Sequence, residues 1–189
     1  MTLINEPQSR LFFALTCSPA LRKMISQWRA SLPLRVGRPV PAANFHLTLL
    51  FLGDVNKAQI ADICAAASKI KVPGRLMTLT LDRLDVWRKS KALVLTPVDA
   101  PPELMRLSYA LEQAMLRFGQ DRENKEFRPH LTLARDYQSQ VPEVGSPPEF
   151  FLRADRFGLY QTHKGRYRLI ADWPLVQPTG GAQTATVSA

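Results

Sequence analysis

The 189-residue sequence has few of the features that mark a secreted, membrane-bound or zinc-loaded protein. It contains only two cysteines, Cys17 and Cys64, without C-x-x-C spacing, so we expect two reduced, buried thiols. No apolar run approaches the roughly 18 residues of a membrane span, and the first residues do not follow the pattern of a secretory signal. A glycine-rich phosphate loop is also missing, so nucleoside triphosphate hydrolysis has no support. The cytoplasm is the expected location.

The composition that remains is typical of a basic globular protein. Hydrophobic residues make up 46% of the chain and charged residues 22%, which is enough apolar material for a sizeable core. The net charge of +9 favours a polyanionic partner such as RNA, although a generically basic protein would show the same charge. We expect one domain over residues 1–176, acting as a monomer, and a disordered low-complexity tail over 177–189.

Histidine is scarce, and two of the three histidines stand in the same tetrapeptide. The segments His46-Leu47-Thr48-Leu49 and His130-Leu131-Thr132-Leu133 are identical. Their alternation of polar and apolar residues is typical of a half-buried strand, in which residues i and i+2 share one face about 7 Å apart. Each copy therefore predicts a strand with its histidine and threonine on one face and its leucines in a core.

Two such strands facing each other would surround one space with two imidazoles and two hydroxyls. Imidazoles with pKa values near ~6.5 can serve as one acid and one base at neutral pH. Hydroxyls suit the non-bridging oxygens of a phosphate, so the set fits in-line displacement at phosphorus without a metal. A single His-x-Thr is more often an ordinary strand segment, but an identical pair is poorly explained by chance.

Two other kinds of site remain open. A metal site would need a carboxylate or thiolate beside the histidines, and no such residue stands at suitable spacing, so we expect no metal and no cofactor. Only proximity in the fold could supply a ligand. A non-catalytic RNA-binding module would explain the charge but not the duplicated His-x-Thr, and no aromatic-rich RNA-binding platform is visible.

The remaining pattern predicts an α+β fold, because consecutive strands in the second half favour antiparallel pairing. His163 falls in a basic hairpin turn and is expected at the surface, and segments 120–125 and 136–148 are expected to be loops. The expected strands cover 11–15, 45–52, 76–87, 91–98, 128–135, 150–161 and 165–173, with a turn at 53–54, and the expected helices cover 19–31, 60–70 and 101–118.

The flanks of the two tetrapeptides sharpen the interpretation. With both motifs in place, the chain resembles the two-histidine (2H) phosphoesterase superfamily, and within it the bacterial RNA 2′,3′-cyclic phosphodiesterases, historically called 2′-5′ RNA ligases. The likeness covers roughly residues 10 to 175. The flanking segments that carry it are Arg10-Leu11-Phe12-Phe13-Ala14, Asn44-Phe45, Phe51-Leu52-Gly53, Phe127-Arg128-Pro129 and Arg135.

The resemblance implies two pseudo-symmetric lobes, each an antiparallel sheet with outer helices, and an active-site cleft between the sheets. It implies hydrolysis of RNA 2′,3′-cyclic phosphate ends, such as those of tRNA fragments, to 2′-phosphate ends. It assigns His46 as proton donor and His130 as proton acceptor, a choice that two identical motifs cannot make themselves. Ligation by the reverse reaction and hydrolysis of small cyclic nucleotides remain alternatives. Substrate contacts are expected from Phe13, Phe51 and Arg128.

Three further residues are expected to bind the phosphate. Thr48 and Thr132 stand two positions after each histidine, and Arg135 could offer a bidentate guanidinium. In a regular strand Arg135, five positions after His130, would point away from it, so a bulge or a strand end is required. The matching position of the first copy is Phe51, which indicates that the two lobes have unequal roles.

Overall fold

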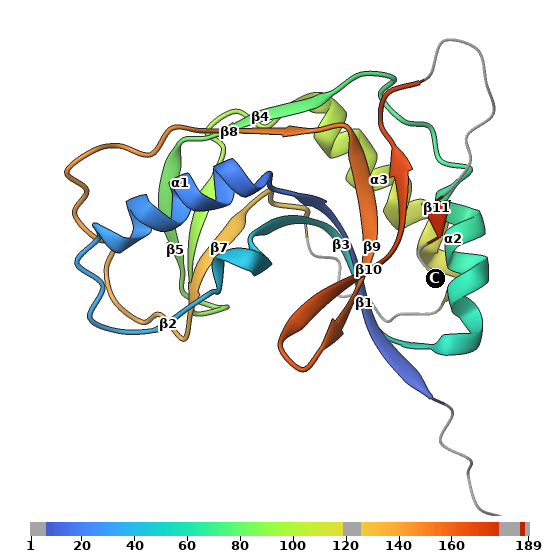
Figure 1. Cartoon of the computed structure of the whole chain (residues 1–189), viewed down its shortest axis with the longest axis horizontal. Coiled ribbons are helices and arrows are strands. Elements are labelled where there is room, and N and C mark those ends of the chain that lie inside the picture. The colour runs from blue at the N-terminus through green and yellow to red at the C-terminus, as the bar shows by residue number, and fades with distance from the viewer. Residues whose placement is uncertain (1–6, 119–125, 178–185, 188–189) are drawn as a thin grey trace, which may run out of the picture.

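The computed structural model describes residues 7–118, 126–177 and 186–187 (Figure 1). Its helices are α1 (Pro19–Ala30), α2 (Ile60–Ala67) and α3 (Pro102–Met115), with short 3-10 turns η1 (Ala42–Asn44), η2 (Lys57–Gln59) and η3 (Leu116–Phe118). Its strands are β1 (Gln8–Thr16), β2 (Arg38–Pro39), β3 (His46–Asn56), β4 (Met77–Leu81), β5 (Arg83–Trp87), β6 (Ala92–Thr96), β7 (Leu131–Arg135), β8 (Phe150–Ala154), β9 (Arg156–His163), β10 (Arg166–Pro174) and β11 (Thr186–Val187).

The strands form two main antiparallel sheets, which confirms the predicted α+β architecture with two lobes. The five-stranded sheet has the order β11-β10-β9-β1-β3, and the four-stranded sheet has the order β2-β7-β6-β5. Strands β4 and β8 pair separately. Helix α1 lies with the four-stranded lobe, while α2 and α3 lie with the five-stranded lobe (Figure 1). Each tetrapeptide therefore belongs to a different lobe, on β3 and on β7.

The lobes are not the two halves of the sequence. The chain leaves the five-stranded lobe after β1, forms α1 and β2 in the other lobe, and returns as β3. The last hairpin, β9 and β10, rejoins β1 in the five-stranded sheet. This exchange of segments ties the lobes together, and it explains why a sequence read in order gives no boundary between them.

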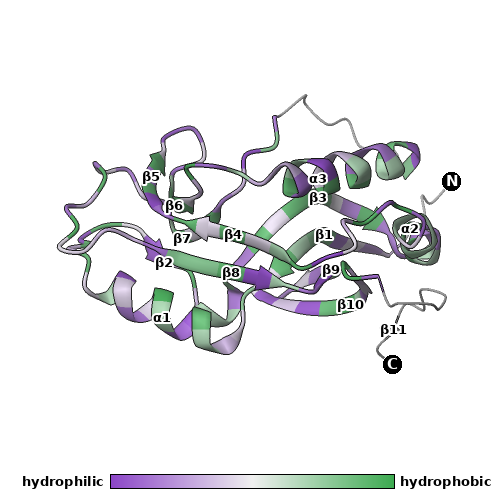
Figure 2. Ribbon diagram, turned by 90° about the horizontal axis from the view of Figure 1, so that it is seen from above, coloured by the Kyte–Doolittle hydropathy of each residue, from purple (hydrophilic) through white to green (hydrophobic). Residues whose placement is uncertain are grey.

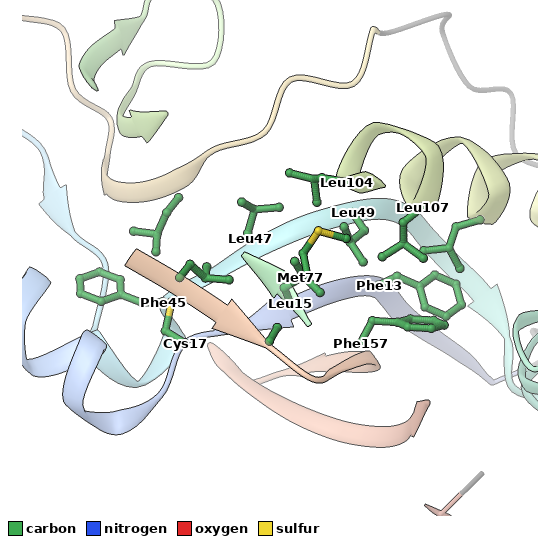
Figure 3. Close-up of a cluster of buried hydrophobic side chains, with 14 of the residues drawn as sticks. Phe13, Leu15, Cys17, Phe45, Leu47, Leu49, Met77, Leu104, Leu107 and Phe157 are labelled. Atoms are coloured by element: carbon green, nitrogen blue, oxygen red, sulfur yellow. The ribbon is translucent and has the colours of Figure 1, made fainter. Parts of the chain in front are cut away.

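The leucines of the tetrapeptides pack into the core, as the alternation predicts. Leu47 and Leu49 are 0% and 2% exposed, and Leu131 and Leu133 are both 0% exposed. Figure 3 shows the first pair grouped with Met77 and with leucines of α3. Burial of each leucine contributes roughly 1.5–3 kcal/mol to the free energy of folding. Because the leucines face the core, the histidine and threonine of each motif lie on the opposite face of the strand.

Local signals place the first helix as expected. The Ser18 hydroxyl accepts the backbone N–H of Leu21 at 3.2 Å, and Pro19 occupies the first helical position. Hydrophobic and polar residues alternate along α1 at helical spacing (Figure 2), with Leu21 and Ile25 buried. The helix is thereby oriented with one face against the four-stranded lobe.

Three expected boundaries are wrong. The alternating segment 76–87 is two strands, because the chain bends at Asp82 and sends β4 and β5 into different sheets. Asp82 is held in the bend by accepting the N–H of Val98 at 2.7 Å. Segment 150–161 likewise divides at Asp155, and the expected turn at 53–54 lies inside β3, which passes through Gly53 with a positive φ of 76°. In both segments the apolar positions shift by one at the bend, from 77, 79 and 81 to 84 and 86, and from 150, 152 and 154 to 157 and 159. The prediction overlooked this shift.

Parts of the remaining expectations concern residues that the structure does not describe. The expected loop 120–125 lies outside the described residues, and so does most of the expected disordered tail. Within the tail, Thr186 and Val187 pair with β10. Among the described residues, no helix is long and apolar enough to cross a membrane.

Candidate active site

Both tetrapeptide strands contain a β-bulge directly after the threonine. In β3, Thr48 and Leu50 pair with the adjacent residues Ala14 and Phe13 of β1, so Leu49 is an extra residue. In β7, Thr132 and Ala134 pair with successive residues of β6, so Leu133 is an extra residue. An extra residue lies outside the ladder and shifts the alternation of the strand by one. The two motifs therefore share a backbone irregularity as well as a sequence.

The bulges decide which way the fifth residue after each histidine points. Because the alternation shifts by one, Arg135 lies on the same face as Thr132, and Phe51 on the same face as Thr48. The condition that the sequence placed on Arg135 is thus met by a bulge. The four-stranded lobe presents an arginine at this position and the five-stranded lobe a phenylalanine.

The His46 ring is held by its own strand and enclosed by aromatic side chains. Its Nδ1 lies 2.7 Å from the Asn44 carbonyl oxygen, and its Nε2 lies 2.8 Å from the Thr48 hydroxyl. The rings of Phe12 and Tyr167 each lie 4.9 Å from the imidazole, centroid to centroid, and Tyr167 meets it edge-on. A carbonyl only accepts, so Nδ1 carries the proton, and in the neutral ring Nε2 accepts from Thr48.

The His130 ring has the same backbone support in a different environment. Its Nδ1 lies 2.8 Å from the Arg128 carbonyl oxygen, again two residues before the histidine. Its ring centroid lies 4.2 Å from that of Trp87 on β5. The guanidinium carbon of Arg128 stands 4.5 Å from the Trp87 ring centroid, so the arginine side chain covers this tryptophan. Nδ1 therefore carries the proton of the neutral His130 ring, and Nε2 is the nitrogen that can accept another.

The pKa values indicate that both imidazoles are neutral at pH 7. Burial lowers the pKa of His46 to about 4; its bond to the Asn44 carbonyl opposes this, and the charges of His130 and Arg135 add to it. Burial also lowers the pKa of His130; the Arg128 carbonyl opposes this, and the positive charges of Arg135 and Arg128 add to it. The charge of Arg135 on β7 thus lowers the pKa of both histidines, one from each lobe.

The remaining predicted site residues are only partly brought together. Phe51 is 49% exposed, stacks on Phe12 at 6.0 Å and lies 5.5 Å below the Arg10 guanidinium, and Arg128 is also exposed. The prediction for Phe13 is wrong: it is fully buried against Phe157 and Trp173, on the core face of β1. Its neighbour Phe12 is the residue that faces His46.

Sequence reasoning missed the aromatic residues around the histidines. Phe12 lies in an unbroken apolar run, where alternation cannot tell one face from the other. Trp87 is the last residue of an expected strand, and nothing in the sequence indicates that it lies beside His130. Tyr167 follows a hairpin turn, and the position of that turn depends on the fold. That tip turns through Lys164 and Gly165 with φ of 49° and 73°, and its Gly165 carbonyl accepts the Asn44 side chain at 2.9 Å. His163 is exposed in this hairpin, as expected.

The described residues give no support to a metal site or to a cysteine nucleophile. Among the described residues, no group of three or more His, Cys, Asp or Glu side chains could hold a metal ion. Cys17 and Cys64 are free thiols, as predicted, although Cys64 is only partly buried. Burial raises the pKa of Cys17 to about 12, so its thiolate is not formed at neutral pH.

Comparison with known proteins agrees with this geometry. The profile of the family described as LigT like Phosphoesterase matches the chain twice, over residues 15–96 and 94–171. The chain is 37% identical over 182 residues to the RNA 2′,3′-cyclic phosphodiesterase of Escherichia coli K12, covering 92% of this chain and all of that protein. It is 28% identical to the protein of the same name from Geobacillus stearothermophilus, over 92% of this chain and 60% of that protein.

Solved structures show the same fold. The crystal structure of E. coli LigT complexed with 3′-AMP superimposes with a TM-score of 0.82 and 35% identity, over 90% of this chain and all of that one. The apo form of E. coli LigT superimposes with a TM-score of 0.78 and 34% identity, over 91% and 100% of the two chains. Because the family profile matches both halves and a relative 37% identical is covered along its whole length, the chain belongs to the LigT-like phosphoesterase family of the two-histidine superfamily.

Proposed function

We propose that this protein hydrolyses 2′,3′-cyclic phosphate ends of RNA and leaves a 2′-phosphate, by acid–base catalysis between His46 and His130. The observation that carries the proposal is the pair of bulged strands, which put Phe51 on the face of Thr48 and Arg135 on the face of Thr132. The charge of Arg135, which lowers the pKa of both histidines, supports it. Relatives named RNA 2′,3′-cyclic phosphodiesterase support the substrate class. The enzyme needs no cofactor in this proposal.

The reaction requires one group on each side of phosphorus. Nε2 of His130 takes a proton from water while the water oxygen bonds to phosphorus and the bond to O3′ breaks. His46 donates a proton to the departing O3′, so phosphate remains on O2′. The guanidinium of Arg135 and the hydroxyls of Thr48 and Thr132 bind the non-bridging oxygens, on which negative charge builds up.

The resting protonation state adds a requirement. With a pKa of about 4, His46 is neutral before substrate arrives and cannot yet donate from Nε2. An anionic phosphate next to the ring favours the imidazolium and raises the pKa of His46. Binding of substrate or phosphate should therefore take up a proton, and the pH–rate profile should be bell-shaped with apparent pKa values that belong to the pair.

The RNA chain is held by groups at the rim of the site. Phe51, which is half exposed, offers its ring to a base, and Arg128 offers a guanidinium already flattened against Trp87. The net charge of +9 attracts the phosphates that follow the end. We include in the proposal that the protein works as a monomer, in the cytoplasm, on RNA ends such as those of tRNA fragments.

A comparison of two substrates across salt concentrations tests the proposal. An oligonucleotide ending in a 2′,3′-cyclic phosphate should show a higher kcat/KM than a cyclic mononucleotide, and this advantage should fall steeply with salt. Equal efficiency without a salt slope would contradict the RNA assignment and favour a small cyclic nucleotide. Ligation would appear in the same assay as a joined product when a 5′-hydroxyl RNA is added.

Histidine variants separate the enzyme from an RNA-binding module. His46→Ala and His130→Ala should abolish hydrolysis while RNA affinity stays within a few fold of the wild type. His163→Ala, at the exposed hairpin tip, is the matched control and should retain both. Wild-type protein that binds RNA without hydrolysing it would leave only the binding module.

A further inference from the structure

One side chain from an outer helix of each lobe donates to the carbonyl of the extra residue in the bulge. In the five-stranded lobe, the Ser108 hydroxyl of α3 donates to the Leu49 carbonyl at 2.7 Å. In the four-stranded lobe, Arg29 of α1 donates from Nη1 to the Leu133 carbonyl at 2.8 Å. Leu49 and Leu133 are the last residues of the two tetrapeptides, so these bonds are made at equivalent positions.

These bonds meet a need that the bulge creates. The extra residue lies outside the ladder, and a buried carbonyl without a partner is costly. Leu49 and Leu133 are 2% and 0% exposed and Ser108 is 3% exposed, so water has little access to either bulge. The Leu133 carbonyl also accepts the backbone N–H of Val40 at 2.9 Å, so Arg29 gives it a second bond. Each helix side chain thus adds a hydrogen bond to the extra residue of a bulge.

Arg29 makes contacts to both tetrapeptide strands. Its Nη1 donates a second bond to the Val40 carbonyl at 2.5 Å, in the segment beside β7. Its guanidinium carbon stands 5.0 Å from the ring centroid of Phe45, the residue directly before His46. Arg29 is half-buried, so this contact is more strongly favoured than the same contact in open solvent. The side chain thus links the start of one motif to the bulge of the other.

We propose that Arg29 and Ser108 are matched positioning residues, which hold the two bulges and so aim Arg135 and Phe51 at the substrate. Arg29 acts on the phosphate through Arg135, and Ser108 acts on the base through Phe51. Neither residue touches substrate. The inference rests on the proposed function, because Arg135 and Phe51 matter only if they contact substrate or phosphate.

The expected effects differ between the lobes. Arg29→Met should lower kcat/KM about 10–100-fold, because small displacements of a charged group in a reacting site carry a large cost. Arg29→Lys should lose much less, since an ammonium can still donate to both carbonyls. Ser108→Ala should raise KM for the oligonucleotide a few fold while kcat stays near the wild-type value.

A double-mutant cycle separates positioning from general structural support. In an Arg135→Met background, adding Arg29→Met should change kcat/KM less than about threefold, because the group it positions is already gone. Independent effects that simply multiply would overturn the proposal. If Arg29→Met does not fold, as judged by circular dichroism, Arg29→Gln, which cannot replace both bonds and the contact with Phe45, takes its place in the cycle.

Two control variants and a second readout complete the test. Arg117→Met removes an arginine that also lies over a phenylalanine, Phe118 at 4.7 Å, but away from the bulges, and should retain full activity. Ser68→Ala removes a hydroxyl that donates within its own helix region and is the control for Ser108. The cycle is repeated on the affinity for inorganic phosphate by calorimetry. If the wild-type protein shows no hydrolysis, the proposed function is wrong. If the Arg29 and Arg135 substitutions lower phosphate affinity independently, so that their effects multiply, the positioning role is wrong.

Discussion

The strands that contain the two tetrapeptides have the same backbone and different surroundings. In each strand the histidine donates a hydrogen bond from Nδ1 to the carbonyl two residues earlier. Each threonine is followed by a bulge whose extra residue accepts a hydrogen bond from a helix side chain. The rings are enclosed differently, by Phe12 and Tyr167 in one lobe and by Trp87 in the other. The backbone thus sets the direction of the catalytic nitrogen, and the neighbours set its proton affinity.

The fifth position after each histidine carries the second difference. The same bulge presents Phe51 in one lobe and Arg135 in the other. A phenylalanine can stack on a base, whereas an arginine can neutralise a phosphate. In the proposed reaction the same backbone irregularity would therefore serve two different parts of a nucleotide.

The largest expected effect concerns what the lobes share. Replacing either His46 or His130 with alanine should lower kcat by about 10²–10⁴-fold, the usual contribution of a general acid or base. The double variant should be little worse than the poorer single variant, because the two groups act in one step. Near-normal turnover by either single variant would break the equivalence of the two motifs.

A pH titration of stability sharpens the difference in surroundings. His46 has a pKa of about 4 in the folded protein and ordinarily 6.5, so the unfolded chain binds its proton more readily. This contribution is fully present above pH 6.5 and is lost as the pH falls toward 4, by roughly 3 kcal/mol of unfolding free energy. Urea titrations should show a shallower pH slope for His46→Asn than for the wild type. Equal slopes for the two proteins would mean that the pKa of His46 is not lowered by burial.

The fifth position gives the next effect. Arg135→Met should lower affinity for inorganic phosphate and kcat/KM by about 10–100-fold, the range for hydrogen bonds to a charged group. Phe51→Leu should leave phosphate affinity unchanged and raise KM only for substrates with a base to stack. The two readouts are phosphate calorimetry and steady-state kinetics. Similar losses in both assays for both variants would erase the proposed division of labour.

Removal of divalent ions is expected to have no effect on hydrolysis. Treatment with a chelator should leave hydrolysis unchanged, because the proposed mechanism places both proton transfers and the charge stabilisation on side chains. Strong inhibition that a divalent ion reverses would show that the histidines of the two lobes share a metal instead.

Much of the site could be predicted because its information is local. The alternation of the repeated His-x-Thr predicts the strands and their faces, and the structure places both leucine pairs in the core as expected. The repetition itself, together with the family resemblance, singled out the two histidines proposed as catalytic. The need for a bulge before Arg135 also followed from counting residues. The α+β class followed from the order of elements, and the pairing of lobes from the family resemblance.

The rest depends on register, which alternation does not contain. Phe12 and Phe13 are adjacent phenylalanines in one apolar run, and only pairing with β3 and β9 shows that Phe12 faces His46. The bend at Asp82 did leave a mark that the prediction overlooked, because the apolar positions shift by one across Asp82 and Arg83. Arg29 and Ser108 were hidden for another reason: their partners are backbone carbonyls of distant residues, which leave no mark in the sequence.

The assignment of acid and base to the two lobes can be tested directly with a modified substrate. An RNA whose terminal 2′,3′-cyclic phosphate carries sulfur in place of O3′ has a leaving group that needs no proton, because a thiol is far more acidic than an alcohol. On this substrate His46→Ala should recover to within about tenfold of the wild type, while His130→Ala should keep its full loss of about 10²–10⁴-fold. Recovery of His130→Ala with continued loss in His46→Ala would contradict the assignment of the two lobes.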